Sequence, residues 1–392
     1  TNEIINENER LKIHSHIDPL TQCLNQKYFI KRFEEEIKRA IREKQYLSLF
    51  ILDIDEFKSF KIDIKAPKTK LTDLVASVEI ARLEETPESL LSRVQYIFQH
   101  DDNLLFYNRG IGDIFIFDET GKFKRKINRT GNGPEEYKQI TDFWLEGDTI
   151  ALFTRSTNRV MKYSFQGDFI ESKRLPFQID HMRSYGDGYV FGTNFTPIQD
   201  SIRYQWGIWD KGLEPTHYFL PYGQSSINKM DVNYSNNTVH MYQNDRFLLR
   251  MHGDSVYLLR NNQLMPIVHL DYGKDWFWTG RGTADGKDFD AVENSGQVWE
   301  NTINIGKQSI YLKSVVAYDS WEHFLINRLD EKVIHIDMIR NSEELFTLYT
   351  LLWQEDRLLC SMPSSEVAEF INQVGVENIE YKQGTSLDII ES

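Results

Sequence analysis

The sequence predicts a mainly β protein: a six-bladed β-propeller with four-stranded antiparallel blades, preceded by a small N-terminal α/β segment. The first observation is a strand–turn–strand unit at Asp113–Tyr137, whose second strand runs into a glycine-broken loop. The second is an internal repeat, because a gapless shift of 46 residues lays Leu104–Tyr107 on Ile150–Phe153 and Gly121 on Gly167. Repeats of roughly 40 to 50 residues built from short strands are typical of propeller blades.

A third copy of the repeat is found at a shift of 219 residues, where Asn108-Arg109 meets Asn327-Arg328. The expected blades span Val94–Ile127, Ile140–Leu175, Ile179–Leu220, Val232–Leu270, Ile310–Met338 and Leu345–Pro363. A strand at Val78–Leu83 precedes the first blade, and we expect it to pair with the last blade and close the ring. The glycine-rich, irregular stretch Asp271–Ile305 is expected to be a loop between blades.

Composition and charge restrict the class of partner. The chain has 392 residues, of which 40% are hydrophobic and 13% aromatic, enough for a large core rich in strands. Its formal net charge of -14 disfavours nucleic acid as a partner, because phosphate recognition needs clustered lysine and arginine. No apolar run reaches the length of a membrane span, and we expect neither a signal peptide nor a lipobox in this sequence. The cysteines, Cys23 and Cys360, are too few for a disulfide framework.

Residues 1–60 form the predicted α/β segment, and residues 61–392 form the predicted propeller. Asp18 begins a helix, and apolar residues recur at helical spacing from Tyr28 to Ile41. The nearly continuous apolar run Leu47–Leu52 then ends at Asp53. This pattern is typical of a buried strand that carries carboxylates at its C-terminal end.

The same 60 residues resemble the first part of a GGDEF (diguanylate cyclase) domain. The stretch DPLTQCLNQKYF is similar to that family's opening DPLTGLxNRRYF, and LDIDEFKSF is similar to its metal-binding DxDxFKxxN. The resemblance implies that Asp53 is a Mg²⁺ ligand. The signature hairpin and the guanine-binding residues of the family have no counterpart, so we expect no diguanylate cyclase activity. No cofactor is expected.

The repeat region also resembles a known group of proteins. The pattern HDDNLLFYNR, DIFIFDETGKFKRKI and RTGNGPEEY is similar to six-bladed β-propeller proteins that are common in gut Bacteroidota. The resemblance covers roughly residue 61 to the C-terminus and is strongest over the first two blades. It implies export to the periplasm or the cell surface, often as a lipoprotein, with no defined biochemical activity.

Polar residues gather on one expected face of the ring. With strands named A to D from the centre outwards, the B-to-C turns and the D-to-A connections lie on the same face. The candidate ligand-binding residues are Arg109, Arg155 and Arg328 in B-to-C turns, with Arg129, Asn132 and Tyr137 in a D-to-A connection. Converging arginines suit a carboxylate or sulfate on a sugar or peptide. The alternative is that each arginine pairs with a carboxylate of the neighbouring blade.

Three other patterns have both a functional and a structural interpretation. The aromatic residues Trp206, Trp209, Trp276, Phe277, Trp278 and Trp299 suit stacking on sugar rings, or else packing in the core. The spacing of His14, His16 and Asp18 is that of a metal site, or else chance beside a helix start. Gly131–Pro134 resembles a phosphate-binding loop, but it lacks the lysine and helix start, which favours a structural turn.

The interpretation that follows is a non-catalytic binding module for a small glycan, a peptide or a protein partner. One alternative is a glycan-active lyase or hydrolase that uses the channel face of the ring. Another is a signalling protein with a degenerate GGDEF segment, and a third is that residues 1–60 are a fusion.

Overall fold

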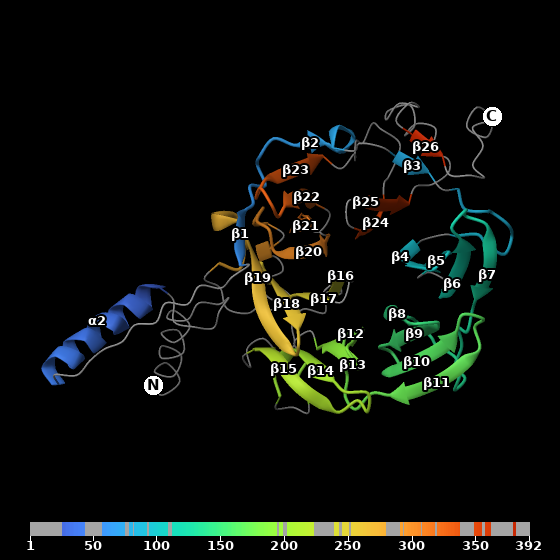
Figure 1. Cartoon of the computed structure of the whole chain (residues 1–392), viewed down its shortest axis with the longest axis horizontal. Coiled ribbons are helices and arrows are strands. Elements are labelled where there is room, and N and C mark those ends of the chain that lie inside the picture. Colours follow the sequence, from blue (N-terminus) through green and yellow to red (C-terminus); the bar gives the residue numbers. More distant parts are fainter. Residues whose placement is uncertain are drawn as a thin grey trace.

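The computed structural model is a β-propeller in which successive sheets are arranged around a central axis (Figure 1). It describes residues 26–43, 57–74, 78–80, 82–91, 94–108, 112–193, 196–198, 202–222, 239–242, 245–250, 252–279, 291–292, 294–306, 308–317, 320–337, 349–354, 357–361 and 379–381. The helix predicted in the N-terminal segment is α2 (Gln26–Glu43). Its neighbours Leu47–Leu52 and Asp53 lie outside the described residues.

Five blades are formed by strands that follow one another in the chain and pair antiparallel. Blade 1 comprises β4 (Val94–His100), β5 (Asn103–Asn108), β6 (Asp113–Asp118) and β7 (Phe123–Ile127). Blade 2 comprises β8 (Asp142–Glu146), β9 (Thr149–Thr154), β10 (Arg159–Ser164) and β11 (Phe169–Arg174). Blade 3 comprises β12 (His181–Tyr185), β13 (Gly188–Gly192), β14 (Tyr204–Trp209) and β15 (Pro215–Pro221). Blade 4 comprises β16 (Val239–Tyr242), β17 (Asp245–Leu249), β18 (Ser255–Arg260) and β19 (Gln263–Asp271). Blade 5 comprises β20 (Glu300–Ile305), β21 (Ser309–Ala317), β22 (Ser320–Asn327) and β23 (Val333–Asp337).

The prediction of six four-stranded blades is not confirmed, because the described residues form five. The remaining strands form two-stranded sheets, one from β24 (Tyr349–Gln354) and β25 (Arg357–Ser361) and one from β3 (Val78–Ile80) and β26 (Ile379–Tyr381). The expectation of a loop throughout Asp271–Ile305 was also wrong at its end, where β20 is the innermost strand of blade 5. The glycines of this stretch lie before β20, so they do not interrupt the strand.

An outer strap, residues 58–84, runs along the outside of the ring (Figure 1). Its first strand, β1 (Lys58–Lys61), pairs in parallel with β19, and β2 (Thr69–Lys70) pairs in parallel with β23. The third strand, β3, pairs in parallel with β26, so the expected pairing of this segment with the last blade, Leu345–Pro363, is not confirmed. Its partner lies beyond the expected last blade. The strap therefore covers sheet edges that would otherwise present unpaired backbone groups.

The strap is also fastened by side chains. Phe60 of β1 is only 2% exposed and packs in the core between blades 4 and 5. At the far end of the strap, the Glu84 backbone N–H donates to the Gly121 carbonyl (2.7 Å), and the Phe123 N–H donates to the Glu84 carboxylate (2.8 Å). These contacts tie the strap to the β6–β7 turn of blade 1.

The core lies between neighbouring blades, so strands are buried on both faces. In β6, all five residues from Asp113 to Phe117 are buried, which explains the continuous apolar run in the sequence. Between blades 1 and 2, Tyr107, Phe143 and Tyr163 are at most 1% exposed.

Among the described residues, no helix has the length and apolar character needed to cross a bilayer.

Candidate ligand-binding groove

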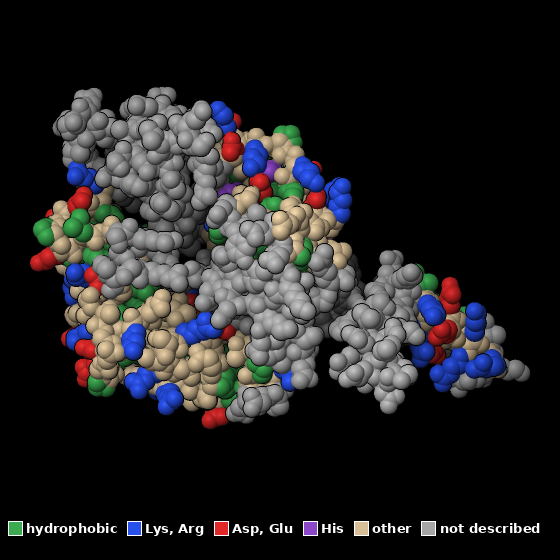
Figure 2. Space-filling model, turned by 180° about the vertical axis from the view of Figure 1, so that it is seen from behind, with side chains coloured by type: hydrophobic (Ala, Val, Ile, Leu, Met, Phe, Trp, Pro, Cys, Tyr) green, Lys and Arg blue, Asp and Glu red, His purple; other side chains and the backbone are tan. Residues whose placement is uncertain are grey.

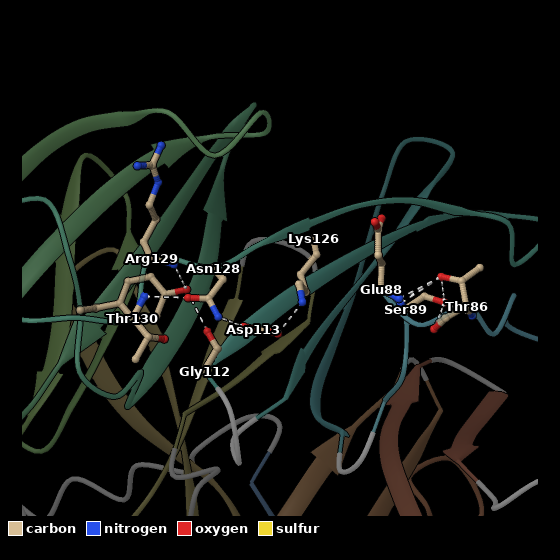
Figure 3. Close-up of polar contacts among 10 residues, drawn as sticks. Thr86, Glu88, Ser89, Gly112, Asp113, Lys126, Asn128, Arg129 and Thr130 are labelled. Carbon is tan, nitrogen blue, oxygen red and sulfur yellow. Dashed lines mark hydrogen bonds and ion pairs between the residues drawn. The ribbon is translucent and has the colours of Figure 1, made fainter.

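The β7–β8 loop, residues 128–141, is fixed by hydrogen bonds at its start. The Asn128 side-chain amide donates to the buried Asp113 carboxylate, and its oxygen accepts the Thr130 N–H at 2.9 Å (Figure 3). Lys126 Nζ lies 3.4 Å from the other oxygen of Asp113. Loop and strand edge therefore form one connected polar network, in which the buried carboxylate has partners.

Tyr137 and Glu136 hold the other end of this loop. The Tyr137 hydroxyl is fully buried and donates to the Gly112 carbonyl at 2.8 Å, and burial raises the pKa of this phenol well above its ordinary value. The Glu136 carboxylate accepts the Gly133 N–H at 2.8 Å. A Cβ at Gly131 would lie 1.9 Å from the same carboxylate, so a larger residue here would require the Glu136 side chain to move. The glycine-rich turn therefore makes local contacts that fit its structural interpretation.

An open groove of about 450 Å³ lies between this loop and the outer strands of blade 2. Its lining residues are Pro134, Glu135, Arg159, Phe169, Ser172 and Arg174. The Tyr163 hydroxyl donates to the Glu135 carbonyl at 2.8 Å, which holds the loop wall against blade 2. The two walls therefore come from different blades but are joined by direct contacts.

Two arginines are cross-strand neighbours in the strand wall of the groove. Arg159 of β10 and Arg174 of β11 are direct antiparallel partners, so two like charges are placed side by side. Within the described part of the chain, no hydrogen bond or ion pair is found for either guanidinium group. Such a pair is unfavourable for folding, and a carboxylate placed between the two groups would relieve the repulsion.

The equivalent position in blade 1 has a different chemistry. The 46-residue repeat places Arg159 on Asp113 and Arg174 on Asn128, and in blade 1 these two residues hydrogen-bond to each other. In blade 1 the two side chains of this cross-strand pair are donor and acceptor to each other. In blade 2 both side chains of the pair are hydrogen-bond donors, and the pair has no acceptor. The comparison shows that the fold does not require arginines at these positions.

The charge near the groove differs from the net charge of the whole chain. The formal net charge is -14, yet Lys and Arg side chains are numerous over the lower part of the face in Figure 2. The neighbouring outer strand β7 carries Lys124, Arg125 and Lys126 within five residues. The lining of the groove itself carries two cations, Arg159 and Arg174, and one anion, Glu135, so its charged side chains are positive on balance.

Of the sequence-predicted ligand residues, the described structure brings Arg129 and Tyr137 together, because the Tyr137 backbone N–H donates to the Arg129 carbonyl at 2.9 Å. Arg129 donates through Nε to the Gly167 carbonyl (3.1 Å), which links the β7–β8 loop to blade 2. Asn132 is exposed at the tip of that loop. Arg155 in the β9–β10 turn has its Nη2 2.7 Å from Oδ1 of Asp180, whose side chain is 4% exposed. This inter-blade pair matches the structural alternative for Arg155.

The structure describes Arg328 but not the remaining candidate site residues. Arg328 is half-buried in the β22–β23 turn, where its carbonyl accepts a hydrogen bond from Lys58 Nζ (2.8 Å). Arg109, the candidate metal ligand Asp53, and the His14–His16 pair lie outside the described residues. The placement of Arg109, Arg155 and Arg328 around one ligand therefore stays a prediction.

The saccharide-stacking interpretation of the tryptophans was wrong. Trp206, Trp209, Trp276, Trp278 and Trp299 are all at most 7% exposed, and Phe277 is 2% exposed. Trp278 Nε1 donates to the Trp299 carbonyl at 2.7 Å, as expected for packed core residues.

Sequence reasoning also missed a buried acid–imidazole pair between blades 4 and 5. His252 Nε2 lies 3.5 Å from the Glu300 carboxylate, with side-chain exposures of 6% and 5%. Burial raises the pKa of Glu300 to about 8. Burial, assisted by the charge of Arg250, lowers the pKa of His252 to about 3. The distance would allow an ion pair, but burial disfavours both charged forms, so both groups are neutral near pH 6.

The arrangement of the sheets defines the protein as a β-propeller. Comparison with known sequences places it in a family. The chain belongs to the family described as "Domain of unknown function (DUF4934)", which matches residues 58–388. Residues 15–63 match the model of the diguanylate cyclase GGDEF domain. No curated protein sequence matches the chain.

Of three solved structures that are similar to the chain, the first supports the fold. A protein from Bacteroides fragilis described as exported is similar with a TM-score of 0.65 at 14% identity, over 85% of this chain and 94% of that chain. A member of the DUF4221 family from Bacteroides vulgatus is similar with a TM-score of 0.45 at 12% identity, over 65% of this chain and 83% of that one. Virginiamycin B lyase from Staphylococcus aureus has a TM-score of 0.38 at 9% identity, over 64% of this chain and 72% of that one.

Proposed function

We propose that this protein is a ligand-binding propeller that recognises an acidic saccharide in the groove between blades 1 and 2. The observation that carries the proposal is the cross-strand pair Arg159–Arg174 in the wall of the groove. Guanidinium groups bind carboxylates through two parallel hydrogen bonds, and two adjacent groups would hold a carboxylate from both sides.

The rest of the groove suits a sugar better than a simple anion. The Ser172 hydroxyl and the Glu135 carboxylate offer a donor and acceptors for sugar hydroxyls. The ring of Phe169, half-buried and packed edge-on against Tyr163, offers an apolar face. A groove of about 450 Å³ has the volume of a typical small-molecule site.

Two features of architecture and location are proposed with this function. We propose that β24–β25 and β3–β26 together complete a sixth blade, because β24 contacts both β20 and β4 and thereby lies between blades 5 and 1. The exported relative in Bacteroides fragilis supports the proposal that this chain is also exported.

The proposal is tested by screening the purified chain against an array of acidic and neutral glycans, with acidic peptides as a second class. For the best glycan, titration calorimetry compares wild type with Arg159→Ala and Arg174→Ala. Each substitution is expected to weaken binding by about 1.5 to 3 kcal/mol, the scale of a hydrogen bond to a charged group. Lys211→Ala removes an exposed cation from the β14–β15 turn of blade 3, outside the groove lining, and serves as the control, with affinity unchanged.

Stability distinguishes this role from a structural one. Because each substitution removes one of two adjacent like charges, the free energy of unfolding should stay equal or rise. Binding of acidic peptides alone, or equal affinity of both variants and wild type, would contradict the proposal. Cleavage of the bound glycan would instead support the lyase or hydrolase alternative.

A further inference from the structure

A second cluster of ligand-type side chains lies at the inner strands of blades 1 and 2, apart from the groove. His100 ends the innermost strand β4, and Asp101 follows it in the β4–β5 turn. Asp148 comes from the β8–β9 turn of the next blade. One nitrogen and two carboxylate oxygens of these residues lie within 4.8 Å of one another. The cluster is therefore assembled by the packing of two blades.

The distances are those of ligands around a small divalent cation. His100 Nε2 lies 3.1 Å from Asp148 Oδ1 and 3.7 Å from Asp101 Oδ2. Ligand atoms about 2.0 to 2.1 Å from a tetrahedral zinc ion lie about 3.3 Å from each other. These two separations lie on either side of that value, and the two carboxylate oxygens lie within 4.8 Å of each other, so the exposed aspartates would close around an ion by side-chain rotation.

Besides the contact of its Nε2 with Asp148, His100 has contacts that do not involve the two carboxylates. The ring packs against Phe165 with centroids 5.0 Å apart, and the Asn103 side-chain amide donates to the His100 carbonyl at 3.3 Å. Asp101 has a φ of 48°, a left-handed conformation that aspartate tolerates better than most residues. The carboxylates are largely open to solvent, with exposures of 78% for Asp101 and 92% for Asp148.

We propose that His100, Asp101 and Asp148 bind one divalent transition-metal ion, of the Zn²⁺ or Mn²⁺ type, with water in the open positions. One imidazole with two carboxylates suits these ions, whereas Ca²⁺ prefers six to eight oxygen ligands. The bound ion bridges β4 of blade 1 and the β8–β9 turn of blade 2. The site is independent of the proposed saccharide groove.

The chain offers a matched control for this site. In blade 3, Asp187 occupies the same place in the β12–β13 turn as Asp148 does in the β8–β9 turn, after the same glycine. The residue that corresponds to His100 in blade 2 is Glu146, which pairs with Lys162 at 2.9 Å. Asp187 therefore has the backbone position of a ligand but no histidine partner in the preceding blade.

The experiment is titration calorimetry of tag-free, chelator-treated full-length protein with ZnCl₂ and MnCl₂. Wild type and Asp187→Asn are expected to bind one ion per chain, while His100→Gln and Asp148→Asn bind at least tenfold more weakly. The double variant His14→Gln/His16→Gln should bind as wild type does, which separates this site from the N-terminal histidines. Unfolding midpoints of the metal-free variants should equal that of wild type, and added metal should raise only those of proteins with the intact cluster.

The opposite results overturn the proposal. They are the absence of saturable binding by wild type, equal affinity of His100→Gln and wild type, or loss of binding in the His14→Gln/His16→Gln variant. Tighter binding of Ca²⁺ than of Zn²⁺ and Mn²⁺ would also overturn it, because the ion class would be wrong.

Discussion

Replacement of Arg155 by alanine should destabilise the ring, because it leaves a buried carboxylate without its cation. Arg155 Nη2 lies 2.7 Å from Asp180 Oδ1, and the side-chain exposures are 34% and 4%. Removing one partner of a fully buried pair costs about 3 to 5 kcal/mol. Because water reaches Arg155, and so partly reaches the contact, we expect about 2 to 3 kcal/mol for Arg155→Ala.

The two partners should behave asymmetrically in urea unfolding. Asp180→Asn should cost less than Arg155→Ala, since the remaining guanidinium is one-third exposed and can be hydrated. The double variant should recover part of the loss, because the orphaned charge is gone. Lys211→Ala is the control, since its pair with Asp187 is exposed and 3.9 Å long, and it should leave the midpoint unchanged. A midpoint of Arg155→Ala equal to that of wild type would refute the structural role.

Further predictions concern the buried pair and the strap. Because burial raises the pKa of Glu300 to about 8 from 4.5, its stabilising contribution is complete below pH 4.5 and is lost as the pH rises through 8. The contribution of His252, whose pKa burial lowers from 6.5 to about 3, is complete above pH 6.5 and is lost towards pH 3. Urea midpoints should thus fall from pH 6.5 to 8 in wild type and less in Glu300→Gln, and identical slopes would contradict this. We also propose that the propeller begins at Lys58, so deletion of residues 1–57 should preserve cooperative unfolding and deletion of 1–83 should not. Equal melting of both truncated proteins would show that the strap does not hold the ring.

The blades nearest the clearest repeat could be predicted from the sequence, because their strands are buried on both faces and read as apolar runs. Their turns were also readable, since Gly121 and Gly167 occupy equivalent positions with φ values of 86° and 89°. The strap was only partly predictable, because β1 and β2 are two to four residues long and their parallel partners lie about 200 or more residues away. No local pattern specifies such a pairing.

The groove could not be predicted because it depends on strand register. Arg159 and Arg174 are separated by a hairpin, and a register shift between Lys162 and Tyr163 helps to decide which residues become partners. The sequence did contain one usable signal. Aligning the repeats shows that arginines replace the mutually hydrogen-bonded Asp113 and Asn128, and such a change at a repeat-equivalent position points to a local function.

The most direct test of the central proposal is a crystal structure of the protein with the best-binding acidic glycan. The proposal predicts the sugar carboxylate in the groove between blades 1 and 2, about 2.7 to 2.9 Å from nitrogen atoms of both Arg159 and Arg174. A glycan bound at another place on the ring, with these two guanidinium groups untouched, would contradict it.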